Sequence, residues 1–175
     1  EMDPMAQEMM KDMTMTMAIQ DKKSRIEMDM GSMMSMVTVF SSEEKKSVVL
    51  MDMMGQKIAQ VSEGEDFDEQ IATQQDLKVT KTSESKKIAG YTCYKALIEN
   101  PDGDGEFEIW FTEDIKVGDV DNPYIYAGIE GFPLEMVVSQ QGMYMRMKAL
   151  SVSTQRMPDS DFSTEIPAGY VIKDN

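Results

Sequence analysis

The feature that most constrains this chain is a set of methionines at every second position in its first third. Met13, Met15 and Met17 alternate with Thr14 and Thr16, and the same spacing returns further on. Of the 20 methionines, 15 lie at or before position 54. A period of two is typical of β-strands with one buried face, because successive side chains point to opposite sides of the strand. The first third of the sequence therefore predicts a sheet whose inner face is lined mostly by methionine side chains.

Short polar turns separate the alternating segments of this region. They lie at 21–23, 31–32, 41–46 and 55–56, and each is short enough to join two neighbouring antiparallel strands. We expect a meander of about five strands within residues 9–62, preceded by an arm at residues 1–8.

The pattern changes after residue 62. The stretch 63–69 is acidic, and Phe67 and Ile71 lie four positions apart, which predicts a short helix with acids at its positive end. Alternation then resumes in the second half. The strands expected there cover 77–82, 87–99, 106–112, 134–140 and 142–154, with a short final strand near 166–170.

These segments predict a mainly β fold of about ten strands with one or two short helices. We expect a single domain over residues 1–175, made of the arm (1–8), the methionine-rich meander (9–62), a short helix and connection (63–76) and the second half of the sheet (77–175). An antiparallel sheet this wide must curl. The expected architecture is a large curved sheet or open half-barrel, its concave face plugged by the helix or by the connection 113–133.

Composition excludes several classes of function. A net charge of −15 repels nucleic acid, so DNA and RNA are not expected partners. No apolar run approaches the ~20 residues of a transmembrane helix. The chain has no histidine, the commonest general base and metal ligand, and with one cysteine it forms no internal disulfide. It begins at Glu1, which is compatible with a leader removed on export.

No stretch of the chain has the pattern of a catalytic or cofactor site. Cys93 lies inside an alternating strand without an evident base, which favours a small buried hydrophobic role. The loop 102–106 lacks the length of an EF-hand and is interpreted as a hairpin turn. The acidic stretch 63–69 is interpreted as a solvated helix start instead of a cation site. We therefore expect a protein that is not an enzyme and has no cofactor.

The methionines themselves are the candidate binding residues. Methionine is unbranched and polarizable, so it adapts to irregular apolar ligands, whereas a plain core would favour leucine or isoleucine. Three functions follow as alternatives: a groove for a lipid-like ligand, a thioether site for Cu(I) or Ag(I), and a closed core in a structural or interaction protein. The candidates for the groove are Met13, Met15, Met17, Met28, Met30, Met36, Met51, Met53, Trp110, Met143, Met145 and Met147.

Four segments of the second half, in this order, resemble a known family. They are KKIAGYTCYKALI (86–98), EFEIWFTEDI (106–115), GFPLEM (131–136) and DFSTEIPAGY (161–170). The chain is similar to an exported bacterial family, of Bacteroidetes type, catalogued as domain of unknown function 4412. The resemblance covers most of residues 77–172, and its motifs supply no catalytic residue.

The resemblance implies a protein of the periplasm or outer membrane, attached through a lipidated leader that this chain does not contain. It also suggests similarity to half-barrel lipoprotein carriers of the LolA and LppX type, whose concave sheet holds acyl chains. Fold similarity does not fix function. The expectation is thus a non-enzymatic envelope protein with a lipid or other apolar small molecule as its partner.

Overall fold

The structure is a computed structural model that describes residues 13–75, 77–99, 106–116, 129–140 and 143–173. It confirms the expected mainly β fold, with two antiparallel-rich sheets and a helix. The chain divides into two compact units. The described residues 13–70 and 156–173 belong to one, here called the six-stranded unit, and residues 71–155 belong to the other, the five-stranded unit.

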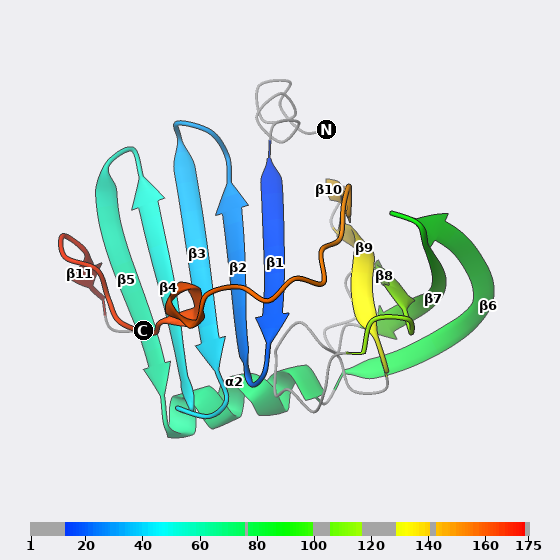
Figure 1. Cartoon of the computed structure of the whole chain (residues 1–175), viewed down its shortest axis with the longest axis horizontal. Coiled ribbons are helices and arrows are strands. Elements are labelled where there is room, and N and C mark those ends of the chain that lie inside the picture. Colours follow the sequence, from blue (N-terminus) through cyan, green and yellow to red (C-terminus); the bar gives the residue numbers. More distant parts are fainter. Residues whose placement is uncertain (1–12, 76, 100–105, 117–128, 141–142, 174–175) are drawn as a thin grey trace. The chain divides into compact units, whose positions relative to one another are not determined.

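The six-stranded unit contains the predicted meander (Figure 1). Its strands are β1 (Thr14–Gln20), β2 (Lys23–Asp29), β3 (Met34–Ser41), β4 (Lys46–Met53) and β5 (Gln56–Glu63), each antiparallel to the next, and β11 (Val171–Ile172), parallel to β5. The five expected strands between residues 9 and 62 are therefore confirmed. The final strand forms too, slightly later in the chain than its expected place near 166–170.

One face of this sheet is covered by the chain that follows residue 156. This segment includes the 3-10 helix η1 (Asp159–Phe162), which contacts β2 and β3 (Figure 1). Arg25 donates a hydrogen bond to the carbonyl oxygen of Asp161 at 2.8 Å. Val39, Val48 and Ala59 point to this face, and each is at most 1% exposed. The apolar residues on this side form an ordinary closed core.

The opposite face is covered at one end by helix α2 (Glu65–Gln75), where the sequence predicted a helix. Phe67 stacks on Phe40 of β3 with ring centroids 4.6 Å apart, and both rings are buried. Beside them, Ser47 donates a hydrogen bond to Gln70 at 3.2 Å. The helix thus attaches to the end of the sheet where β3 finishes and β4 begins.

The five-stranded unit contains the second sheet, in the order β10-β9-β8-β7-β6. Its strands are β6 (Lys78–Ile88), β7 (Tyr91–Glu99), β8 (Glu106–Thr112), β9 (Phe132–Gln140) and β10 (Met143–Lys148). All neighbouring pairs are antiparallel. The predicted strands at 106–112 and 134–140 are confirmed; the first pairs with β7 and the second with β8.

One turn of this sheet was missed by the sequence analysis. The predicted strand 87–99 is interrupted at Ala89-Gly90, where both residues have positive φ, 49° and 88°. Two consecutive residues of this kind make a tight hairpin between Ile88 and Tyr91. Glycine adopts this conformation freely, but alanine rarely does, so the pair lacked the usual signal of such a turn.

Gly131 is required where β9 approaches β8. A Cβ atom added to Gly131 would lie 2.2 Å from the carbonyl oxygen of Thr112, which no side chain tolerates. Just beyond it the pairing of β8 with β9 shifts register between Trp110 and Phe111. Trp110 therefore pairs with Glu135, and Phe111 with Pro133. This irregularity, a β-bulge, decides which side chains of β9 share a face with Trp110.

The expected single curved sheet or half-barrel of about ten strands is not confirmed. The described strands form separate sheets of six and five, because α2 intervenes between β5 and β6 and starts a new sheet. Most of the connection 113–133, the predicted plug, lies outside the described residues. That both units fold as one domain stays a prediction.

Candidate functional site

Methionines of four neighbouring strands face one another in a single row across the six-stranded sheet. Met15 pairs with Met28, Met28 with Met36, and Met36 with Met51. The row ends on β5 at Ile58, the partner of Met51. Directly paired residues lie on the same face with Cβ atoms about 5 Å apart. We call Met15, Met28, Met36 and Met51 the methionine ladder.

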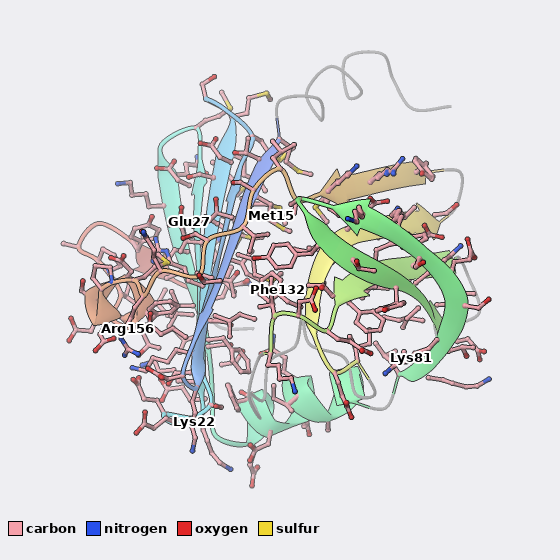
Figure 2. All side chains as sticks on the ribbon, turned by 45° about the vertical axis from the view of Figure 1, so that its right-hand side comes forward. Met15, Lys22, Glu27, Lys81, Phe132 and Arg156 are labelled. Atoms are coloured by element: carbon pink, nitrogen blue, oxygen red, sulfur yellow. The ribbon has the colours of Figure 1, made fainter. Side chains whose placement is uncertain are left out.

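The ladder lies beyond the part of the sheet that α2 covers. Met36 is four residues from Phe40 along β3, which corresponds to about 13 Å of extended strand. Figure 2 shows Met15 on β1 far from the end at which Lys22 and α2 lie. All four ladder side chains are half-buried. The sheet therefore presents an apolar surface that is neither fully enclosed nor fully solvated.

A second group of methionines lies at the edge of this face, in the turns after β2 and β4. Met34 pairs with Met53, and the backbone N–H of Met54 donates to the carbonyl oxygen of Met33 at 3.2 Å. Met54 is 83% exposed, Met33 45% and Met53 38%. We call these four residues the methionine rim. Met34 is half-buried like the ladder, so exposure falls towards the ladder from the other three rim residues.

The remaining predicted candidates of this unit lie close to the ladder. Met17, on β1, pairs with Ile26 in the row beside it. Met13 and Met30 stand immediately outside the ends of β1 and β2, and both are half-buried. Together with Met53 in the rim, all eight candidates between residues 13 and 53 come from one sheet. The six that lie within strands share one face of the sheet: Met15, Met17, Met28, Met36, Met51 and Met53.

The candidates in the five-stranded unit do not share one face. Trp110 pairs with Glu135, whereas Met147 pairs with Met136, the next residue of β9. Neighbouring residues of a strand point to opposite sides, so Trp110 lies on one face and Met145 and Met147 lie on the other. Met143 begins β10, and its side chain lies outside the described residues. The sheet therefore separates the tryptophan from the methionines.

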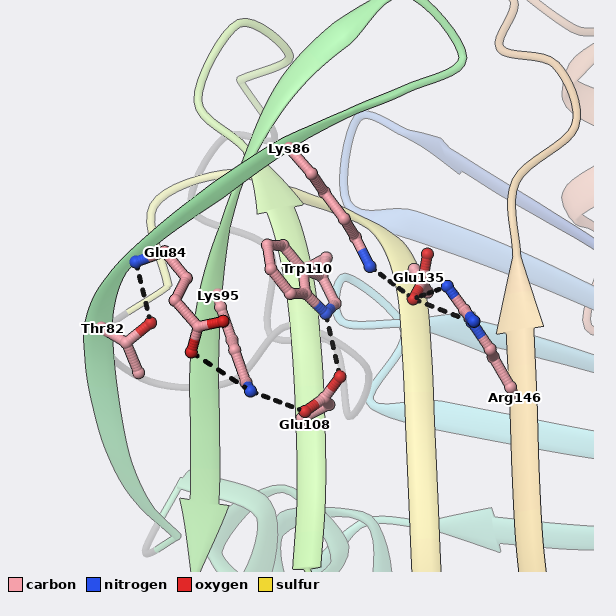
Figure 3. Close-up of polar contacts among 8 residues, drawn as sticks. All are labelled: Thr82, Glu84, Lys86, Lys95, Glu108, Trp110, Glu135 and Arg146. Atoms are coloured by element: carbon pink, nitrogen blue, oxygen red, sulfur yellow. Dashed lines mark hydrogen bonds and ion pairs between the residues drawn. The ribbon is translucent and has the colours of Figure 1, made fainter.

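The face that carries Trp110 holds a buried charge that the sequence analysis did not identify. Glu135 is 2% exposed, and its Oε1 accepts hydrogen bonds from Lys86 Nζ at 2.6 Å and from Arg146 Nε at 3.0 Å (Figure 3). Its other oxygen, Oε2, is buried and has no hydrogen-bond partner in the described part of the chain. Because a buried carboxylate needs such partners, both cations are required here.

Lys86 also links this carboxylate to the tryptophan. Its Nζ lies 3.7 Å from the centroid of the Trp110 ring, a close cation–π contact. The indole N–H of Trp110 donates to Glu108 at 3.0 Å, and Glu108 pairs with Lys95 at 3.0 Å (Figure 3). Lys86, Glu135, Arg146, Trp110, Glu108 and Lys95 therefore belong to one connected network, in which, among buried side-chain atoms, only Oε2 of Glu135 lacks a hydrogen-bond partner in the described residues.

This network changes the pKa values of two of its members. Burial raises the pKa of Glu108, but hydrogen bonds from Trp110 and Lys95 outweigh it, and the pKa is lowered. The hydrogen bond to Glu108 raises the pKa of Lys95, with a further contribution from Glu84. Both shifts keep the groups charged over a wider pH range. The arrangement is that of a structural ion network with a fixed geometry.

Beneath the network lies a small hydrophobic cluster. Ile88, Cys93, Trp110 and Leu134 are buried together, and Val152 packs against them. Burial raises the pKa of the Cys93 thiol, so the thiolate that a nucleophile needs is disfavoured. The prediction that Cys93 is a small buried residue is confirmed.

The described residues give no support for a carboxylate cation site at the start of α2 or elsewhere. Within them, no group of three or more Asp, Glu, Cys or His side chains is arranged to hold a metal ion. The acidic start of α2 is solvated, with Asp68 paired to Lys45 at 2.9 Å. The loop 102–106 lies almost wholly outside the described residues. Among the residues that the structure describes, no helix is both long and apolar enough to span a membrane.

Comparison with known proteins gives a family but no activity. The chain is similar to two solved structures of PNGF-II, in the C2 and P21 space groups, with 17% and 15% identity and TM-scores of 0.47 and 0.46. These similarities cover 93% of this chain but 30% and 31% of the others, so the chain spans under a third of their length. No curated protein matches. The model of the family described as domain of unknown function (DUF4412) matches residues 1–122 and 124–170, and the chain belongs to that family.

Proposed function

We propose that this is a non-enzymatic protein of the bacterial cell envelope that binds a lipid-like apolar ligand along the methionine ladder. The observation that carries the proposal is the continuous row of half-buried methionines across four strands. The opposite face of the same sheet is closed by residues 156–173 and holds ordinary aliphatic side chains. Methionine is therefore concentrated on the face that remains partly open.

The dimensions of the ladder suit one acyl chain. From β1 to β5 the row crosses four inter-strand spacings of ~4.8 Å, or about 19 Å. A lipid tail in one leaflet spans about 15 Å, half of the ~30 Å hydrocarbon thickness of a bilayer. A tail laid across the strands would contact a thioether on each of β1 to β4. Flexible thioethers adjust to such a ligand with little strain.

The placement in the envelope rests on the resemblance of the family to exported proteins, and lipid binding is in keeping with carriers of the LolA type. A ligand-carrying role needs no catalytic group. Within the described residues, Cys93 is buried with a raised pKa, and the charged network around Trp110 is held by internal partners.

Fluorescence titration with a fatty acid whose emission rises in apolar surroundings tests the proposal. The protein, purified without detergent, should bind the probe, and Met28→Gln with Met36→Gln should weaken binding at least tenfold, about 1.4 kcal/mol. Met145→Gln, a half-buried methionine of the five-stranded sheet, is the matched control. If the native protein binds no probe and releases no lipid on organic extraction, the proposal fails.

A soft metal is the second candidate, favoured by the register of the ladder. Three paired methionines on adjacent strands, with Cβ atoms about 5 Å apart, bring flexible thioethers within reach of one ion. Thioethers prefer Cu(I) and Ag(I) to harder cations. Calorimetric titration with Ag(I) decides: uptake that survives Met15→Leu, Met28→Leu and Met36→Leu combined would exclude the ladder as the site.

A further inference from the structure

The exposure of the methionines is graded along one face of the six-stranded sheet. Three rim residues are the most open, with Met54 at 83%, Met33 at 45% and Met53 at 38% exposed, while Met34 is half-buried. The four ladder residues are half-buried. By contrast Met136, in the five-stranded sheet, is 8% exposed. Nothing in the packing of a core requires thioethers at the most solvated positions of a sheet.

We propose that the rim and ladder form an oxidation site for peroxide-class oxidants. The thioether sulfur attacks one oxygen of hydrogen peroxide; an S–O bond forms and the O–O bond breaks. The sulfur loses two electrons to the peroxide, and the leaving hydroxide takes up the remaining proton, so the products are a sulfoxide and water. Susceptibility follows access to the sulfur, and reductases that act on methionine sulfoxide reverse the reaction.

The register of the sheet makes the rim a first target and the ladder a second. Met34 of the rim stands two residues before Met36 of the ladder on β3, and Met53 stands two residues after Met51 on β4. Side chains two apart on a strand share a face about 7 Å apart. An oxidant that arrives at the rim turns meets four thioethers before it reaches the ladder, so the rim protects the ladder at low doses.

Oxidation of the ladder changes the character of the face. Each sulfoxide is polar, whereas the thioether it replaces is apolar. Because Met28 and Met36 each have a ladder methionine on both sides, one sulfoxide places a polar group directly beside two thioethers. If the ladder binds an apolar ligand, which rests on the function proposed above, its oxidation releases that ligand.

Peptide mapping by mass spectrometry after timed exposure to hydrogen peroxide measures the order of oxidation. Met54 should be oxidised about tenfold faster than Met136, in keeping with exposures of 83% and 8%. The ladder should fall between them. Equal rates at the rim, the ladder and Met136 would overturn the proposal.

A rim variant tests protection. With peroxide limited to about four equivalents per protein, one for each rim methionine, the ladder of the native protein should stay mostly reduced. In the variant Met33→Leu, Met34→Leu, Met53→Leu and Met54→Leu the same dose should oxidise the ladder severalfold more. Identical ladder oxidation in both proteins would show that the rim protects nothing.

The fluorescent fatty acid separates this inference from the proposed function. Bound probe should be lost as the ladder is oxidised and regained after treatment with sulfoxide reductase. For the variant Met15→Leu, Met28→Leu, Met36→Leu and Met51→Leu, the ratio of probe bound after peroxide to probe bound before it should stay near one, whatever its starting affinity. If the oxidised native protein retains the probe, oxidative release is refuted. If the native protein never binds the probe, the proposed binding of an apolar ligand is refuted, and the order of oxidation is still judged by peptide mapping.

Discussion

The two sheets of this protein each have one face with an unusual set of side chains, and these side chains are held in different ways. In the six-stranded sheet the face beyond α2 is lined by methionines, which have no fixed partner atoms and pack in many ways. In the five-stranded sheet the face around Trp110 is fixed by directional contacts from Lys86, Glu108 and Glu135. The first surface adapts to what it meets, and the second has one arrangement that satisfies its charges. This contrast places the adaptable face in the six-stranded unit, where we propose that the ligand binds.

The largest expected effect comes from the core of the five-stranded sheet. Phe111 is fully buried, so Phe111→Ala should lower the free energy of unfolding by about 3–5 kcal/mol. Met36→Ala, in the half-buried ladder, should cost less than half as much. Urea denaturation measures both. Equal losses would mean that the ladder is as tightly packed as a core, and the contrast between the sheets would disappear.

The next effect concerns the buried carboxylate. Glu135→Gln removes the charge that pairs with Lys86 and Arg146 and should cost about 1.5–3 kcal/mol, the range for hydrogen bonds to charged groups. Glu84→Gln is the control, because the side chain of Glu84 is 60% exposed and its pair with Lys95 is worth about 0–1 kcal/mol. A loss at Glu135 no greater than at Glu84 would show that the network does not fix this sheet.

Replacement of the ladder by leucine should have a smaller effect on stability. Met→Leu conserves volume and usually costs less than about 1.5 kcal/mol. We expect Met28→Leu to stay within that limit and the protein to keep its unfolding cooperativity. Thermal and urea unfolding of the same sample measure both quantities. A much larger loss would indicate that the thioethers make specific contacts that leucine does not reproduce.

The smallest effect is a pH dependence in the six-stranded unit. A hydrogen bond from Thr164, and then one from Lys23, lower the pKa of Glu44. A carboxyl whose folded pKa is depressed adds stability above its unfolded pKa of about 4.5 and loses it as pH falls through the folded value. Since the side chain is 42% exposed, solvent keeps the contribution within about 0–1 kcal/mol.

Thr164→Val should remove part of this acid-sensitive stability. The difference in urea midpoint between native protein and variant should be present at pH 7 and shrink as the pH falls below about 4.5 and through the lowered pKa of the folded carboxyl. A difference that is constant with pH would assign the effect of Thr164 to packing alone.

Most strands of the six-stranded unit could be predicted from the sequence, because the alternation of apolar and polar residues indicates which side chains of a strand share a face. Ile26 and Met28, which alternate with Arg25, Glu27 and Asp29, define β2 without any knowledge of the fold. Alternation does not state which residue of one strand lies opposite which residue of the next. The ladder depends on that register, which the lengths of the turns set.

The charged network was missed although the sequence contains a signal for it. Glu135 stands within an apolar run, between Leu134 and Met136, and a charge in such a run must be buried with partners or end the strand. Its partners, Lys86 and Arg146, are 49 and 11 residues away and are joined to it only by strand pairing. The β-bulge that aligns Glu135 with Trp110 leaves no mark in hydrophobic periodicity.

The pairing of β11 with β5 has a consequence for how the protein is made. Residues 71–155 form the five-stranded unit, and they are synthesised between the meander and the segment 156–173 that covers it. Until that segment leaves the ribosome, Val39, Val48 and Ala59 lack their cover. The meander therefore has an exposed apolar face until then. Its contacts with residues 156–173 join distant parts of the chain, and contacts of this kind form slowly. Strands β1 to β5 are therefore made before the five-stranded unit but completed only after it.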